Sequence, residues 1–191
     1  MTVGIFGGSF NPVHNGHIAL ARTIIKQGLA DEVWLTLSPL NPLKSNPEEL
    51  LDDHSRLEML QLATEGIPGL RVCDIELSMP KPSYTINTLL TLYRRHPAID
   101  FRLIIGSDNM LVFDKWKSSD EIMRLFPPIV YPRPGYTCSD ALDLPLSPVS
   151  STLVRERLRK GENVDDLIPP QVYRYIQEHK LYTGYPGTSL R

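Results

Sequence analysis

The sequence predicts an α/β fold, a Rossmann-like doubly wound parallel sheet with helices on both faces. Short apolar runs alternate along the chain with segments whose apolar residues recur at helical spacing. Loops rich in glycine, proline and asparagine separate the two kinds of segment. Alternating strands and helices place the strands in parallel and cover both faces of the sheet.

The expected strands are apolar runs that end at turn-forming residues. The first run stops at Gly7-Gly8 and the fourth stops at Gly106. The five expected strands cover residues 2–6, 32–37, 70–77, 101–105 and 128–131.

The expected helices combine apolar spacing with recognisable ends. A first helix carries Ile18 and Ile24 and ends at Gly28, and Asn15 is its expected N-cap. Ser118 with Glu121 predicts a capping box at the start of a later helix. The remaining helices are expected at 53–64, 85–95, 118–126, 152–160 and 170–179. The helix 152–160 is expected to be capped by Ser150 or Ser151, and the helix 170–179 has proline in its first turn.

Length and composition fit a single domain over residues 1–191, with a core of about 2–182 and a loose tail at 183–191. The net charge of -2 argues against a bulk nucleic-acid binder, which would carry a basic face. No apolar run approaches the length of a membrane span, so we expect no membrane partner. Cys73 and Cys138 show no metal-binding spacing and are expected to be reduced thiols, which makes the cytoplasm the expected location.

Ligands of doubly wound sheets bind at the carboxyl ends of the strands, near the point where the strand order reverses. The loops of interest are therefore 7–17, 38–47, 78–85, 106–116 and 132–151.

The first of these loops combines glycines with paired histidines. Gly7 and Gly8 let a ligand approach the backbone, and His17 falls in the first helical turn, where free N–H groups favour anions. His14 lies three residues before His17, so both rings can donate to one polyphosphate. Neither a carboxylate nor a cysteine completes a metal-ligand set in this loop, and no Walker A or GxGxxG pattern is present. The residues alone also allow a tight turn with two incidental histidines.

The run GGSFNPVHNGH resembles the signature of the nucleotidylyltransferase superfamily, whose (H/T)xGH motif here is His14-Asn15-Gly16-His17. The resemblance implies that both histidines contact ATP phosphates and stabilise the charge that moves onto the leaving pyrophosphate. It also implies ATP contacts from the preceding residues Gly7, Gly8, Ser9 and Phe10.

A second anion site is expected where hydroxyls begin a helix. Ser150, Ser151 and Thr152 precede Arg155 by one turn, an arrangement that binds phosphate or simply caps a helix with a surface arginine. The run resembles the ISSTxxR motif of the same superfamily, which implies ATP binding opposite the histidines. Lys44 similarly resembles the basic residue of the superfamily's PPHK-type loop, where Asn41 is also expected to contact the acceptor.

Further segments resemble bacterial nicotinate-nucleotide adenylyltransferases. Residues 82–89 match a PSYTxxTL segment, 106–109 match a GxD loop, and 131–136 match an RPGY segment. The resemblance implies that Gly106 and Asp108 contact ATP, and that the acceptor is bound by Tyr84, Thr85, Trp116 and Arg133. An indole is the best aromatic partner for a cationic pyridinium ring, which suits Trp116 to stacking on it.

The expected enzyme is an adenylyltransferase that moves AMP from ATP to nicotinate mononucleotide, giving deamido-NAD and pyrophosphate by direct in-line attack. His14, His17, Lys44 and Arg155 are the expected catalytic residues. Mg²⁺ is expected as the cofactor, bound through the ATP phosphates and not by a protein metal site. A homodimer is left open. The alternatives are nicotinamide mononucleotide or another phosphate acceptor, and a non-catalytic ATP-binding sensor of the same fold.

Overall fold

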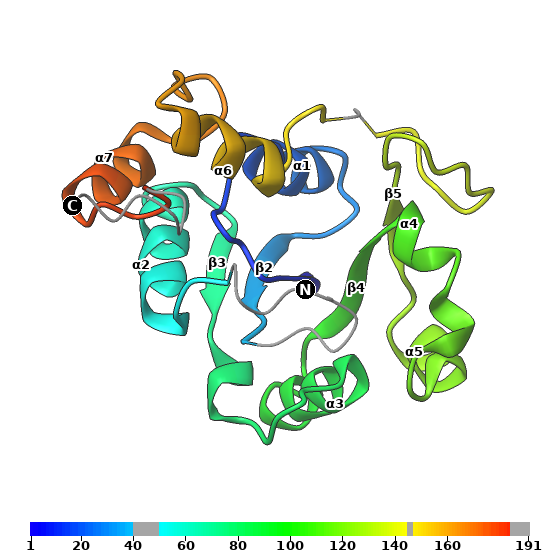
Figure 1. The fold of residues 1–191 in the computed structure, drawn as a ribbon. Helices are drawn as coiled ribbons and strands as arrows, with labels where there is room; N and C mark the ends of the chain where they lie inside the picture. Colours follow the sequence, from blue (N-terminus) through cyan, green and yellow to red (C-terminus); the bar gives the residue numbers. More distant parts are fainter. Residues whose placement is uncertain (40–49, 145–146, 184–191) are drawn as a thin grey trace.

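The computed structural model describes residues 1–39, 50–144 and 147–183. A parallel sheet of five strands forms its centre, in the order β3-β2-β1-β4-β5 (Figure 1). The strands are β1 (Thr2–Gly8), β2 (Glu32–Leu37), β3 (Leu70–Cys73), β4 (Asp100–Gly106) and β5 (Ile129–Tyr131). The order reverses at β1, between β2 and β4, so the doubly wound sheet expected from the sequence is confirmed.

Helices cover both faces of this sheet. Figure 1 shows α1, α2, α6 and α7 on one side and α3 and α5 on the other. Their bounds are α1 (Asn15–Lys26), α2 (Asp53–Thr64), α3 (Thr85–Arg95), α4 (Ser107–Met110), α5 (Ser119–Leu125), α6 (Ser151–Lys160) and α7 (Pro170–Glu178), with short 3-10 helices η2 (Ile75–Ser78) and η3 (Phe113–Lys115).

The core lies in two layers because side chains alternate along each strand. In β1, Phe6 packs into the cluster beneath α1 and α2, whereas Val3 and Ile5 pack into the cluster beneath α3 and α5. All three are at most 4% exposed, so β1 is buried on both faces.

Four local expectations are corrected by the structure. The expected strand 70–77 ends at Cys73, its last pair with β2, and residues 75–78 turn into η2. The segment 106–109 is not an open loop, because α4 begins at residue 107. Ser118 has a left-handed backbone with φ of 55° and no side-chain cap bond, so the expected capping box is wrong. Asn15 is not the N-cap either: His14 is, and the side-chain Nδ2 of Asn15 donates to Asp166 O instead.

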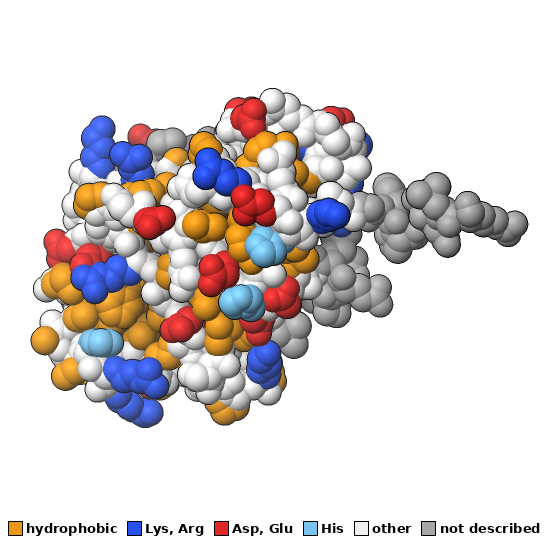
Figure 2. Space-filling view, turned by 90° about the vertical axis from the view of Figure 1, so that its left-hand side faces the viewer, with side chains coloured by type: hydrophobic (Ala, Val, Ile, Leu, Met, Phe, Trp, Pro, Cys, Tyr) orange, Lys and Arg blue, Asp and Glu red, His pale blue; other side chains and the backbone are white. Residues whose placement is uncertain are grey.

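The surface that Figure 2 shows carries acidic and basic side chains interspersed with apolar ones. None of the helices in the described part of the chain combines the length and the apolarity that a membrane crossing requires.

Candidate active site

The two histidines of the first loop form one stacked pair. The chain leaves β1 at Gly8 and enters α1 with His14 as the N-cap and His17 in the first turn. The ring centroids lie 3.6 Å apart with an interplanar angle of 27°. The His14 backbone N–H donates to His17 Nδ1 at 3.2 Å. Because Nδ1 accepts this bond, the proton of a neutral His17 lies on Nε2, which leaves Nε2–H as a donor.

His14 is kept neutral by its surroundings. Its side chain is buried, and burial together with the positive charge of Arg133 lowers its pKa from 6.5 to about 3. The side chains of His14 and His17 face each other's backbone N–H groups in a capping box at the start of α1.

The loop that carries the histidine pair packs against the core through Phe10. Phe10 is buried with a positive φ of 42°, and its ring stands edge-on to His17 at 5.0 Å. The Phe10 side chain therefore supports His17 from within the core. A Cβ on Gly16 would meet Ser147 Oγ and lie 3.0 Å from His14 Nδ1, so glycine is needed for the histidine's position.

The start of α6 lies against the same loop, as expected for the second half of a phosphate site. Ser150 caps α6 by accepting from the Leu153 N–H at 3.1 Å. Ser151 Oγ donates to Pro12 O and Arg155 Nη1 donates to Asn11 O, both at 2.9 Å. Segments that lie far apart in the sequence are thus joined directly beside the histidine pair.

A cavity of about 250 Å³ opens at the carboxyl ends of β1 and β4. Its lining includes Gly7, Gly8 and Gly106 from the strand ends, and Tyr84, Thr85 and Trp116 from the segments expected to bind the acceptor. Trp116 Nε1 is buried without a hydrogen-bond partner in the described part of the chain. Lys115 and Lys117 also line the cavity, and Lys117 Nζ lies 4.5 Å from the centre of the Tyr84 ring.

A carboxylate and a guanidinium flank the end of β4. Arg133 Nε lies 3.6 Å from Asp108 Oδ2, and the Arg133 backbone N–H donates to Ser107 Oγ at 2.9 Å. Asp108 Oδ1 is buried with no hydrogen-bond partner among the residues described. A Cβ on Gly106 would meet this oxygen and lie 3.0 Å from Arg133 Cγ. Because glycine has no Cβ, the side chains of Asp108 and Arg133 can lie close to the backbone of Gly106 at the end of β4.

The expected residues Asn41 and Lys44 lie outside the described residues, and Thr152 is exposed at the start of α6. The other expected residues lie around the ends of β1 and β4. One group joins the loop after β1 to the start of α6 and comprises Ser9, Phe10, His14, His17, Ser150, Ser151 and Arg155. A second group lines the cavity and comprises Gly7, Gly8, Gly106, Tyr84, Thr85 and Trp116. Asp108 and Arg133 flank the end of β4 and are not among the residues that line the cavity. Among the described residues, no three histidine, cysteine or acidic side chains are grouped to hold a metal ion.

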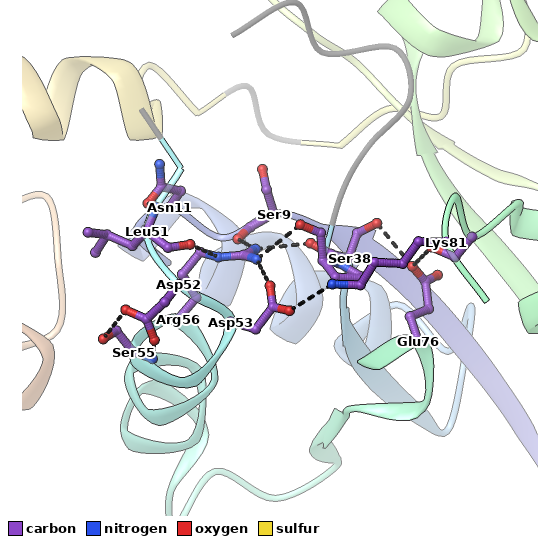
Figure 3. Close-up of polar contacts among 12 residues, drawn as sticks. Ser9, Asn11, Ser38, Leu51, Asp52, Asp53, Ser55, Arg56, Glu76 and Lys81 are labelled. Carbon is purple, nitrogen blue, oxygen red and sulfur yellow. Dashed lines mark hydrogen bonds and ion pairs between the residues drawn. The ribbon is translucent and has the colours of Figure 1, made fainter. Parts of the chain in front are cut away.

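Arg56 was not expected as a site residue, yet it ties two candidate loops together (Figure 3). Its guanidinium is fully buried and forms an ion pair with Asp53. Nη1 donates to Ser9 O at 2.7 Å and to Ser38 O at 2.9 Å. The sequence held a signal: Arg56 lies one turn before Leu60 on the buried face of α2.

Glu76 was also not expected. It is a buried carboxylate that lines the cavity, and it lay in a segment that the sequence suggested was a strand. In the structure Glu76 lies in η2, where its carboxylate accepts from Ser38, after β2, and from Ser83, before α3. A strand at this position would not indicate these contacts.

Comparison with known proteins first defines the class. Residues 5–157 match the cytidylyltransferase-like family model, and this range includes the end of β1, the histidine pair and the start of α6. The chain is therefore a nucleotidyltransferase.

The narrower family follows from its relatives. A Bacteroides fragilis protein named "Probable nicotinate-nucleotide adenylyltransferase" is 44% identical, over 91% of this chain and 90% of its own. A Bacillus pumilus protein of the same name is 38% identical, over 94% and 97%. The chain belongs to the nicotinate-nucleotide adenylyltransferase family.

Solved structures confirm the fold. The nicotinic acid mononucleotide adenylyltransferase of Plasmodium falciparum complexed with NaAD has a TM-score of 0.76 at 21% identity, covering 95% of this chain and 97% of its own. A second structure of the Plasmodium enzyme, complexed with APC, has a TM-score of 0.73 at 20% identity, covering 95% and 96%.

Proposed function

We propose that the chain transfers AMP from ATP to nicotinate mononucleotide, forming deamido-NAD and releasing pyrophosphate. The observation that carries this proposal is that the histidine group and the cavity group lie next to each other at the point where the strand order reverses. A stacked imidazole pair and the start of α6 lie beside a cavity that carries an indole. The names of the relatives supply the acceptor.

The reaction needs no protein nucleophile. A phosphate oxygen of the mononucleotide attacks the α-phosphorus of ATP and forms a new P–O bond. The bond from this phosphorus to the oxygen that bridges the α- and β-phosphates breaks. The electron pair of that bond leaves with pyrophosphate. Catalysis is then orientation and charge stabilisation, for which preorganised donors are the effective groups.

His17 has the clearest role in this scheme. Its Nε2–H is held as a donor by the bond that Nδ1 accepts from the His14 backbone. Such a donor strengthens its bond as negative charge develops on the leaving oxygen. His14, Lys44 and Arg155 would complete the set of groups around the triphosphate, with contacts to ATP from Gly7, Gly8, Ser9 and the hydroxyls that begin α6.

Mg²⁺ would arrive with ATP and neutralise phosphate charge, bound mainly through phosphate oxygens and its own waters. The donor set at the end of β4 suits this mode of binding. Asp108 has a buried carboxylate oxygen without a hydrogen-bond partner in the described part of the chain, and this oxygen can accept from a metal-bound water.

The acceptor would lie in the cavity with its pyridinium ring on Trp116 and its phosphate near Arg133. The nicotinate carboxylate would be bound by backbone N–H groups at Tyr84 and Thr85. Lys115 and Lys117 line the same cavity, and their positive charge favours the acid over the amide.

Turnover of the two mononucleotides tests this proposal. The purified chain with Mg-ATP should form deamido-NAD and pyrophosphate, with a kcat/KM at least about tenfold higher for nicotinate than for nicotinamide mononucleotide. Preference for the amide would contradict the acceptor. Nucleotide binding without pyrophosphate release would instead identify a sensor.

A further inference from the structure

The carboxylate of Glu76 joins three segments around the cavity. Oε2 accepts from Ser38 Oγ at 3.0 Å and from Ser83 Oγ at 2.8 Å, and Oε1 accepts from Thr88 Oγ1 at 2.9 Å. Glu76 is 7% exposed and forms no ion pair among the described residues. A buried carboxylate is costly, and these three hydroxyl donors are what stabilise it.

Two of the three donors belong to the segment 82–89, which is expected to bind the acceptor through Tyr84 and Thr85. Ser83 directly precedes Tyr84 and Thr85, and Thr88 lies in the first turns of α3. Ser83 and Thr88 are both buried and, like Glu76, line the cavity wall. Glu76 therefore fixes the residue before the acceptor contacts and the helix that follows them.

The third donor, Ser38, is anchored independently of Glu76. Its backbone N–H donates to Gly8 O at 2.8 Å, and its carbonyl accepts from Arg56 at 2.9 Å. Figure 3 shows Ser38 between Arg56 and Glu76. The backbone of Ser38 thus keeps its place at the end of β2 without the Ser38 hydroxyl, whereas no other side-chain bond of Ser83 is seen within the described residues.

We propose that Glu76 is a positioning residue for acceptor binding, which acts through Ser83 to hold the backbone of Tyr84 and Thr85 against the cavity. This role rests on the proposed function. Glu76 then contributes to the affinity for the mononucleotide. It takes no part in the chemical step, because its carboxylate is hydrogen-bonded to hydroxyls of the protein. Glu76 bonds to Ser38, Ser83 and Thr88, and none of these is expected to contact ATP, so ATP binding is left unaffected.

The test is a comparison of single hydroxyl deletions by steady-state kinetics with both substrates varied. Ser83→Ala should raise the KM for nicotinate mononucleotide about tenfold, with the KM for ATP within about twofold and kcat within about threefold. Ser38→Ala removes a donor from the same carboxylate oxygen and should raise the mononucleotide KM less. Ser83→Thr keeps the hydroxyl and should restore most of the affinity.

Thr64→Ala is the matched control for loss of a buried hydroxyl, because within the described residues the Thr64 hydroxyl donates only to carbonyls of its own helix, α2. It should lower Tm and leave both KM values unchanged. Glu76→Gln should resemble Ser83→Ala in direction, and Ser83→Ala keeps the test valid if the Glu76 variant does not fold.

The outcomes separate this role from the proposed function. If Ser83→Ala raises the KM of both substrates equally, or of neither, while the wild-type chain is active, the positioning role is wrong and the proposed function stands. A wild-type chain that forms no deamido-NAD would overturn both.

Discussion

The buried, neutral imidazole of His14 should make the stability of the fold depend on pH. Its pKa is about 3 in the folded chain, mainly because of burial, against 6.5 in the unfolded chain. Between these values only the unfolded chain binds the proton, so the free energy of unfolding falls as the pH falls through this window. Above pH 6.5 both states are neutral at this position and the contribution is fully present.

The size of the effect follows from the two pKa values. From pH 7.5 to pH 5.0, the protonation of His14 in the unfolded chain lowers the free energy of unfolding by about 2 kcal/mol. His14→Asn removes the titrating group and should remove this part of the pH dependence. All other groups titrate in both proteins and cancel in the difference.

Urea unfolding of both proteins at the two pH values measures the effect. The wild-type chain should lose about 2 kcal/mol more than His14→Asn between pH 7.5 and 5.0, at equal m-values. A difference below about 0.5 kcal/mol would refute the reasoning. It would mean that the imidazole is solvated or finds a negative partner.

Three further predictions concern ligands. His17→Ala should lower kcat about a hundredfold and change the KM for ATP far less, since its donor acts on developing charge; an equal loss in ATP affinity at unchanged kcat would refute that role. Trp116→Ala should raise the KM for nicotinate mononucleotide about tenfold and Trp116→Phe less, in the same initial-rate assay; equal KM values for all three proteins would exclude stacking. Gly7→Ala should leave Tm unchanged, because a Cβ there has no atom within 4 Å. It should nevertheless weaken ATP binding, measured by calorimetry, because the methyl group enters the ligand cavity; unchanged affinity would place the nucleotide elsewhere.

Local patterns sufficed for much of the fold. The bounds 32–37, 53–64 and 85–95 match β2, α2 and α3, because periodicity and end signals lie within each segment. The expected strand 70–77 failed because its end is set by its partner: β2 pairs with β3 only as far as Thr36 and Cys73. The capping box expected at Ser118 is wrong because Ser118 has a left-handed backbone conformation, which the residue type does not indicate.

The motifs predict the family, and the comparisons with relatives confirm it. The polar network behind the loops was not predicted. Arg56 and Glu76 lie in ordinary helical and apolar surroundings in the sequence, and their partners Ser9 and Ser38 come from distant segments. Only the folded chain shows that these buried charges connect the loops at the strand ends.

The most direct test of the central claim is a crystal structure with a non-hydrolysable ATP analogue and nicotinate mononucleotide. We expect a triphosphate oxygen within about 3.2 Å of His17 Nε2 and the pyridine ring stacked on Trp116. Nucleotides bound elsewhere, with the imidazole pair and the indole free of ligand, would contradict the proposed site.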